Sequence, residues 1–145
     1  MILACLLHDI GHVLDVDSPQ MANSAGQSYG AQHHETIGAN FLLSKGFSKS
    51  IATMVGNHVL AKRYLVWKRG KEYIASLSGA SVETLKHQGG ILSDEQARNF
   101  EKDPLFAMCI KVREADEQAK ISPHPNDCPT FEYFHQMIVE HLCDN

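Results

Sequence analysis

The stretch Leu7-His8-Asp9-Ile10-Gly11-His12 lies near the start of the chain and governs the interpretation of everything after it. Apolar residues at positions 2, 3, 6, 7, 10, 13 and 14 form a broad helical stripe around it, so His8 and Asp9 are expected at the end of a buried helix. Neighbouring helical residues diverge by about 100°, so both side chains can reach one ion only where a helix end leaves room. A carboxylate beside an imidazole suits a divalent cation, and a carboxylate can also bridge two cations.

The composition fits one soluble domain. The 145 residues are 43% hydrophobic and 21% charged, which is enough for a single core. A net charge of −4 gives no general case for nucleic acid or an acidic membrane as partner. The four cysteines (Cys5, Cys109, Cys128 and Cys143) form no C-x-x-C pair, and with no signal peptide or membrane-spanning run they predict a reduced, cytoplasmic protein.

Helical patterns dominate the chain and predict an all-α fold without a strand pair. Helices are expected over Glu35–Lys45, from Ser48 past Val55, and over Lys71–Leu77, Ser81–Gln88, Ser93–Glu101, Asp103–Lys120 and the C-terminal region from Thr130. Two segments, Asp15–Gln32 and Ser122–Pro129, are expected as loops, the first of the length typical of an active-site lid. The last helix is expected to bury Phe131, Phe134, Met137, Ile138, His141 and Leu142.

Three further residues, His34, His58 and Asp116, change the interpretation of the His8-Asp9 pair. Alone, each could be a surface or capping residue, and an isolated His-Asp pair is usually a core histidine beside a helix-end aspartate. Together they supply three imidazoles and two carboxylates, which is sufficient for a two-metal centre. His33 stays open as an alternative ligand to His34.

Several polar residues fall one helical turn from a proposed ligand. His12 follows His8 by four positions, Lys62 follows His58 by four, and Arg113 precedes Asp116 by three. One short helix also carries the stripe Ser81, Thr84 and Gln88. Such a set suits a tetrahedral oxyanion such as phosphate or phosphonate. The alternative is a set of solvated, exposed helix faces.

On these residues the chain resembles the HD-domain superfamily. More narrowly, it resembles the mixed-valent di-iron oxygenases that cleave carbon–phosphorus bonds of hydroxylated aminophosphonates. The matching runs are His34-Glu35, Gly38-Ala39, Gly56-Asn57-His58, Ala61-Lys62-Arg63-Tyr64-Leu65, Ser81, Thr84-Leu85, Gln88-Gly89-Gly90, Phe100-Glu101, Asp103-Pro104, Arg113, Asp116 and Ala119-Lys120. The AKRYL and QGG runs are the most specific to the oxygenase branch.

The resemblance implies an HD-domain helical bundle that binds two irons. One iron takes His8, Asp116 and bridging Asp9, and the other takes Asp9, His34 and His58. The residues implied to grip the phosphonate are His12, Lys62, Ser81, Thr84, Gln88 and Arg113. The catalytic set is His8, Asp9, His12 and Lys62. The implied reaction uses dioxygen to convert a small phosphonate, such as 2-amino-1-hydroxyethylphosphonate or its trimethylammonio analogue, to phosphate and glycine or a betaine.

The chain departs from that family in one respect. Its members supply a further histidine ligand, and cover for the amino end of the substrate, from a helix before the HD pair. Here only seven residues precede His8, so residues 1–145 are expected to form a single HD domain truncated at its N-terminus. Apolar surface at Ile2, Leu3 and Leu6 then favours a homodimer.

Two other functions stay open. An HD phosphohydrolase acting on a nucleotide or phosphate ester would use Mn²⁺, Mg²⁺ or Co²⁺ and no oxygen. Two histidines between the HD pair and Asp116 disfavour its simplest form. A non-catalytic binding domain is the third candidate.

Overall fold

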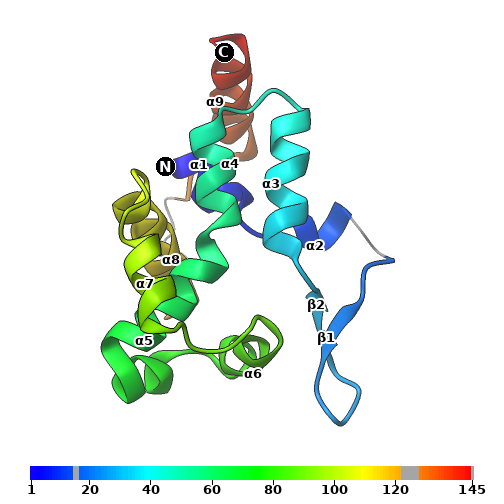
Figure 1. Ribbon diagram of the computed structural model, residues 1–145. Helices are drawn as coiled ribbons and strands as arrows, with labels where there is room; N and C mark the ends of the chain where they lie inside the picture. Colours follow the sequence, from blue (N-terminus) through cyan, green and yellow to red (C-terminus); the bar gives the residue numbers. More distant parts are fainter. Residues whose placement is uncertain (15–16, 122–127, 145) are drawn as a thin grey trace.

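The computed structural model describes residues 1–14, 17–121 and 128–144, which form a mainly helical protein (Figure 1). The described helices are α1 (Ile2–Leu7), α2 (Gly11–Leu14), α3 (His34–Ser44), α4 (Lys49–Gly56), α5 (His58–Ser76), α6 (Gly79–His87), α7 (Asp94–Phe100), α8 (Phe106–Ile121) and α9 (Phe131–Cys143). The predicted helical fold is confirmed. Among the described residues, none of the helices combines the length and apolar character that crossing a membrane requires.

The helices pack around one hydrophobic core. Helices α3 and α4 lie side by side, α5 packs along α8, and α1 contacts α4, α8 and α9 (Figure 1). The most deeply buried members of the core include Ala4, Leu42, Val55, Ala61, Leu65, Val66, Cys109 and Val112. This packing brings the ends of α1, α3 and α5 together, and His8, His34 and His58 lie at these ends.

The segment predicted as a lid-like loop contains a β-hairpin, so the expectation of no strand pair was wrong. Strand β1 (Gln20–Ala22) pairs antiparallel with β2 (Ser28–Ala31). The Asn23 side chain accepts the backbone N–H groups of Ala25 and Gln27 and shapes the turn between the strands. The strands are three and four residues long and lack an alternating apolar pattern, which is why periodicity did not reveal them. Residues 15 and 16 of the predicted loop lie outside the described part of the chain.

Several helix boundaries differ from the predicted ones. Element α5 extends to Ser76, but Gly70 has a non-helical backbone (φ 62°, ψ −142°) that separates its two helical parts, so the helix predicted over Lys71–Leu77 is present as the part after this kink. Helix α8 begins at Phe106, because Asp103 caps a preceding turn by accepting the N–H of Leu105 at 2.7 Å. The capping box of Ser93 and Gln96 is confirmed.

Helix α9 is more exposed than predicted. Phe131 is 76% and Leu142 37% exposed, while Met137 and Ile138 pack against the core only in part. Phe134 and His141 are also partly buried. Most of the predicted Ser122–Pro129 loop before α9, residues 122–127, lies outside the described residues.

Candidate metal centre and anion pocket

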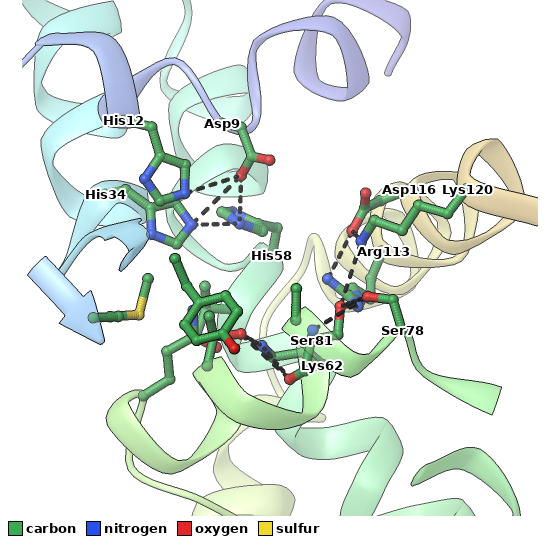
Figure 2. Close-up of a pocket in the computed structure, with 16 residues that line it drawn as sticks. Asp9, His12, His34, His58, Lys62, Ser78, Ser81, Arg113, Asp116 and Lys120 are labelled. Carbon is green, nitrogen blue, oxygen red and sulfur yellow. Dashed lines mark hydrogen bonds and ion pairs between the residues drawn. The ribbon is translucent and has the colours of Figure 1, made fainter. Parts of the chain in front are cut away.

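Asp9, His34 and His58 form a compact group of potential metal ligands. One ligand atom from each lies within 4.8 Å of the other two. Nε2 of His34 is 3.1 Å from Nε2 of His58, and Oδ1 of Asp9 is 3.5 Å from both nitrogens (Figure 2). The segment that carries Asp9 can lie this close to the start of α3 because residue 11 is a glycine. A Cβ at Gly11 would lie 1.9 Å from the carbonyl oxygen of His34.

The second oxygen of Asp9 faces a different pair of residues. Oδ2 of Asp9 lies 3.2 Å from Nε2 of His8, and that nitrogen lies 3.5 Å from Oδ1 of Asp116. His8 belongs to the end of α1, whereas Asp116 projects from the middle of α8. The Asp9 carboxylate therefore stands between two groups of potential ligands, as a bridging carboxylate does in a two-metal site.

Three histidines share one backbone arrangement. The Nδ1 atoms of His8, His34 and His58 lie 2.7, 3.2 and 2.7 Å from the carbonyl oxygens of Cys5, Ala31 and Val55, each three residues back. A carbonyl only accepts, so each Nδ1 carries a proton and donates it. In each neutral ring the lone pair is then on Nε2, the atom that faces Asp9, as in histidine ligands oriented by outer hydrogen bonds.

The charges of the centre follow from burial and from these contacts. Burial and the neighbouring rings of His58 and His12 lower the pKa of His34 to about 3, so this ring is neutral. Burial opposes ionisation of Asp9, but the contacts of its carboxylate with the His58 and His8 rings hold its carboxyl pKa well below the ordinary value. Burial also disfavours a charged His8, yet Asp116 and Asp9 raise the pKa of His8 to about 10. A cation bound there would displace that proton.

The donor atoms fit a divalent metal ion. The distances among Asp9, His34 and His58 leave a common point about 2 Å from all three atoms, close to the ~2.0–2.2 Å of metal–nitrogen and metal–oxygen bonds. Two lone pairs that face each other repel unless a proton or a cation lies between them. Imidazole and carboxylate donors suit iron, manganese and zinc alike.

A cavity of about 200 Å³ adjoins the metal centre. Lys62 lies beside it, is 2% exposed, and donates to the Thr84 hydroxyl at 3.0 Å and to the Ser81 carbonyl at 3.3 Å. Burial, with Arg113 and Lys120 nearby, lowers the pKa of Lys62 to about 7. These positions suit a group that binds an anion.

Arg113 and Lys120 connect this pocket to the metal centre. Arg113 donates to Asp116 at 2.7 Å and to the Ser81 hydroxyl at 3.4 Å, and it also pairs with Glu117. Lys120 contacts the same three partners, at 3.0 Å from Asp116, 3.5 Å from Ser81 and 3.6 Å from Glu117, and Figure 2 shows it beside Arg113 and Asp116. Asp116 thus contacts His8 through one oxygen and two cations through the other.

The structure brings the residues predicted from the sequence together. The cavity is lined by Asp9, His12, His34, His58, Lys62, Ser81, Thr84, Gln88, Arg113 and Asp116, with His8 adjoining through Asp9 and Asp116. Lys62, Ser81, Thr84 and Arg113 are buried, so the alternative of solvated helix faces is wrong for them. His33 lines a separate pocket with Glu35 and His87, and His34 is the histidine that faces Asp9.

The cavity also contains residues that sequence reasoning assigned no role. These are Met21, Tyr29, Val59, Ser78, Ala80 and Lys120. Lys120 lies four positions after Asp116, and the same spacing rule that found Lys62 could have found it. Met21 and Tyr29 lie on the hairpin, and no pattern in the sequence predicted its strands.

This fold and site define the class of protein. The family profile of the HD domain matches residues 1–117, and the chain belongs to this family. Within it, the chain is 36% identical over 148 residues to [1-hydroxy-2-(trimethylamino)ethyl]phosphonate dioxygenase (glycine-betaine-forming) of Leisingera caerulea, covering 98% of this chain and 70% of the relative.

Two other relatives extend the comparison. Hydroxymethylphosphonate dioxygenase of Gimesia maris is 34% identical over 120 residues, which is 83% of this chain and 57% of the relative. An uncharacterized protein of Acanthamoeba polyphaga mimivirus is 39% identical over 145 residues, which is 100% of this chain and 64% of the relative. The chain is therefore related to phosphonate dioxygenases and spans 57 to 70% of the length of these three proteins.

Proposed function

We propose that this protein is a di-iron oxygenase that cleaves the carbon–phosphorus bond of a small 1-hydroxyphosphonate. The observation that supports this most is the Asp9 carboxylate, whose two oxygens face different ligand groups at the edge of a cation-lined cavity. A bridging carboxylate serves a pair of metal ions, and buried cations serve an oxyanion. The relationship to two phosphonate dioxygenases favours iron and dioxygen within that chemistry.

In this proposal the ligands divide into two sets around Asp9. His34 and His58 would hold one iron, His8 and Asp116 would hold the other, and Asp9 would be shared by both. When bound, the irons would supply the redox chemistry that lets dioxygen oxidise the hydroxyl-bearing carbon. Each imidazole is oriented in advance by its backbone carbonyl partner, which lowers the cost of assembling the site.

The protein's own side chains would bind and orient the phosphonate. Lys62 and Arg113 are placed to neutralise its oxygens, and each cation already contacts a hydroxyl, Lys62 that of Thr84 and Arg113 that of Ser81. The His12 ring, stacked at 3.8 Å on His34, offers a further donor between the pocket and the metal centre. Holding the phosphonate there would place the carbon next to it close to the proposed irons, and cleavage would leave phosphorus as phosphate in the cationic pocket.

The substrates named for the relatives set the range to be tested. One carries a trimethylamino group and the other is hydroxymethylphosphonate. We propose 2-amino-1-hydroxyethylphosphonate, giving glycine, or its trimethylated analogue, giving a betaine.

An activity assay separates this function from phosphate-ester hydrolysis. The protein is first loaded with iron under anaerobic conditions. Oxygen and substrate are then added, and oxygen uptake and phosphate release are recorded. We expect phosphate release only with oxygen, and uptake only with the hydroxyphosphonate. Phosphate release from phosphoethanolamine without oxygen, in the presence of Mn²⁺, would instead identify a phosphohydrolase and overturn the proposal.

A further inference from the structure

The backbone of Ala31 is hydrogen-bonded to two histidine rings, one through its N–H and one through its carbonyl. Its N–H donates to Nδ1 of His12 at 3.0 Å, and its carbonyl accepts from Nδ1 of His34 at 3.2 Å. The two rings stack with centroids 3.8 Å apart and planes 20° apart. Ala31 ends strand β2 and is 1% exposed, so water does not compete for these contacts.

These two hydrogen bonds impose opposite tautomers. A backbone N–H can only donate, so Nδ1 of neutral His12 accepts and its proton resides on Nε2. A carbonyl can only accept, so the proton of neutral His34 resides on Nδ1 and leaves a lone pair on Nε2. The backbone of one residue, Ala31, therefore makes Nε2 a hydrogen-bond donor in His12 and an acceptor in His34.

Gly30 lets the hairpin reach the His12 ring. Its φ of +97° lies in the region that favours glycine. A Cβ added there would lie 2.5 Å from Nδ1 and 2.6 Å from Cε1 of His12. Any side chain at this position must displace the ring or the strand, and either movement would break the hydrogen bond from Ala31.

We propose that Gly30 and Ala31 are positioning residues that keep His12 as an Nε2–H donor to the substrate and His34 as an Nε2 lone-pair donor to a metal ion. The arrangement keeps His12 out of the ligand set, although its Nε2 lies only 4.0 Å from Oδ1 of Asp9. That Nε2 of His12 contacts a substrate and Nε2 of His34 a metal ion rests on the proposed function. The two tautomers are properties of the metal-free protein, so they can be tested whether or not the proposed function is correct.

The first test is a long-range ¹H–¹⁵N correlation spectrum of metal-free protein with ¹⁵N-labelled histidine, recorded near pH 8. His12→Asn and His34→Asn assign the two spin systems by loss of signals. We expect His12 as a pure Nε2–H tautomer and His34 as a pure Nδ1–H tautomer. His12 protonated on Nδ1, or an averaged mixture of tautomers, would overturn the proposal.

Two glycines of the same hairpin offer a matched pair of variants. Gly26 also has a positive φ, +80°, but an added Cβ there meets no atom within 4 Å. Both Gly26→Ala and Gly30→Ala introduce backbone strain, while only Gly30→Ala touches His12. We expect the single-tautomer pattern of His12 to be retained in Gly26→Ala and lost in Gly30→Ala.

The spectra keep this inference separate from the proposed activity. An unchanged His12 pattern in folded Gly30→Ala would contradict the role of Gly30. Should that variant not fold, the wild-type spectrum alone decides the tautomers. If the protein has the expected tautomers but no oxygenase activity, the proposed function is wrong and the positioning role stands. If the protein is active but has other tautomers, the positioning role is wrong and the proposed function stands.

Discussion

Lys62 donates a 3.0 Å hydrogen bond to the Thr84 hydroxyl from a position where its side chain is almost inaccessible to water. A buried ammonium group costs free energy unless it is fully paired, and here its partners are a hydroxyl and a carbonyl rather than a carboxylate. The lowered pKa of Lys62 has burial as its main cause and Arg113 as the next. The lysine therefore fits a role in binding an anion better than a role in stability.

Lys62→Met is expected to stabilise the protein and to weaken anion binding. Met removes a buried cation, and Thr84 still donates to the Ser81 carbonyl at 3.3 Å. A gain of about 1 kcal/mol would raise Tm by roughly 2–4 °C. Affinity for inorganic phosphate, measured by calorimetry, should fall about tenfold or more. The exposed Lys86 gives the control Lys86→Met, and a destabilised Lys62→Met with unchanged phosphate affinity would contradict the account.

The same lysine predicts how stability depends on pH. Its pKa is about 7 in the folded protein and 10.5 in the unfolded chain, so between these values the unfolded state binds more protons. The contribution of Lys62 to stability therefore rises with pH across that window and is constant below it. The Tm advantage of Lys62→Met should shrink from pH 7 toward pH 10. Thermal unfolding at several pH values tests this, and a constant difference would speak against a buried, titrating lysine.

Two adjacent histidines provide a matched test of the metal centre. His34 faces Asp9 and His58, whereas His33 precedes α3 with a φ of 59° and lines a different pocket. We expect His34→Ala to retain at most about one of the two metal ions. His33→Asn should keep both, because asparagine tolerates a positive φ. Elemental analysis measures both variants, and equal metal content in the two would refute the assignment of His34.

A substitution of Asp116 tests the second ligand set, which contains His8 and Asp116. Its Oδ1 faces His8, while its Oδ2 is paired with Arg113 and Lys120. Asp116→Asn should lose the ion on the His8 side and leave the ion held by Asp9, His34 and His58, giving about one ion per chain. Retention of both ions, or loss of both in a folded variant, would show that the two ligand sets are not separate.

The helical class and several residues that line the cavity could be predicted because helix periodicity and ligand spacing are local properties. His12, Lys62 and Arg113 each lie about one turn from a proposed ligand, and all three line the same cavity. The His34-Glu35 pattern favoured His34 over His33, and the structure shows that His34 is the histidine that faces Asp9. Both residues lie at the start of α3, where His33 has a left-handed backbone and His34 faces Asp9.

The β-hairpin and its contact with His12 could not be predicted from local patterns. Its strands are too short for a periodic pattern, and the contact between Ala31 and His12 joins residues 19 positions apart. The exposure of Phe131 was mispredicted because amphipathic spacing indicates an apolar face but not the presence of a neighbour to cover it. Long-range packing decided each of these features.

The most direct test of the account is the iron content of wild-type protein and of Asp9→Ala, both loaded without oxygen and measured by elemental analysis. Asp17→Ala, which removes an exposed carboxylate nearby in the sequence, is the control. We expect about two irons per chain in the wild type and control, and essentially none in Asp9→Ala, because both ligand sets share this residue. Two irons retained in Asp9→Ala, or fewer than two in the wild type, would contradict a two-metal centre bridged by Asp9.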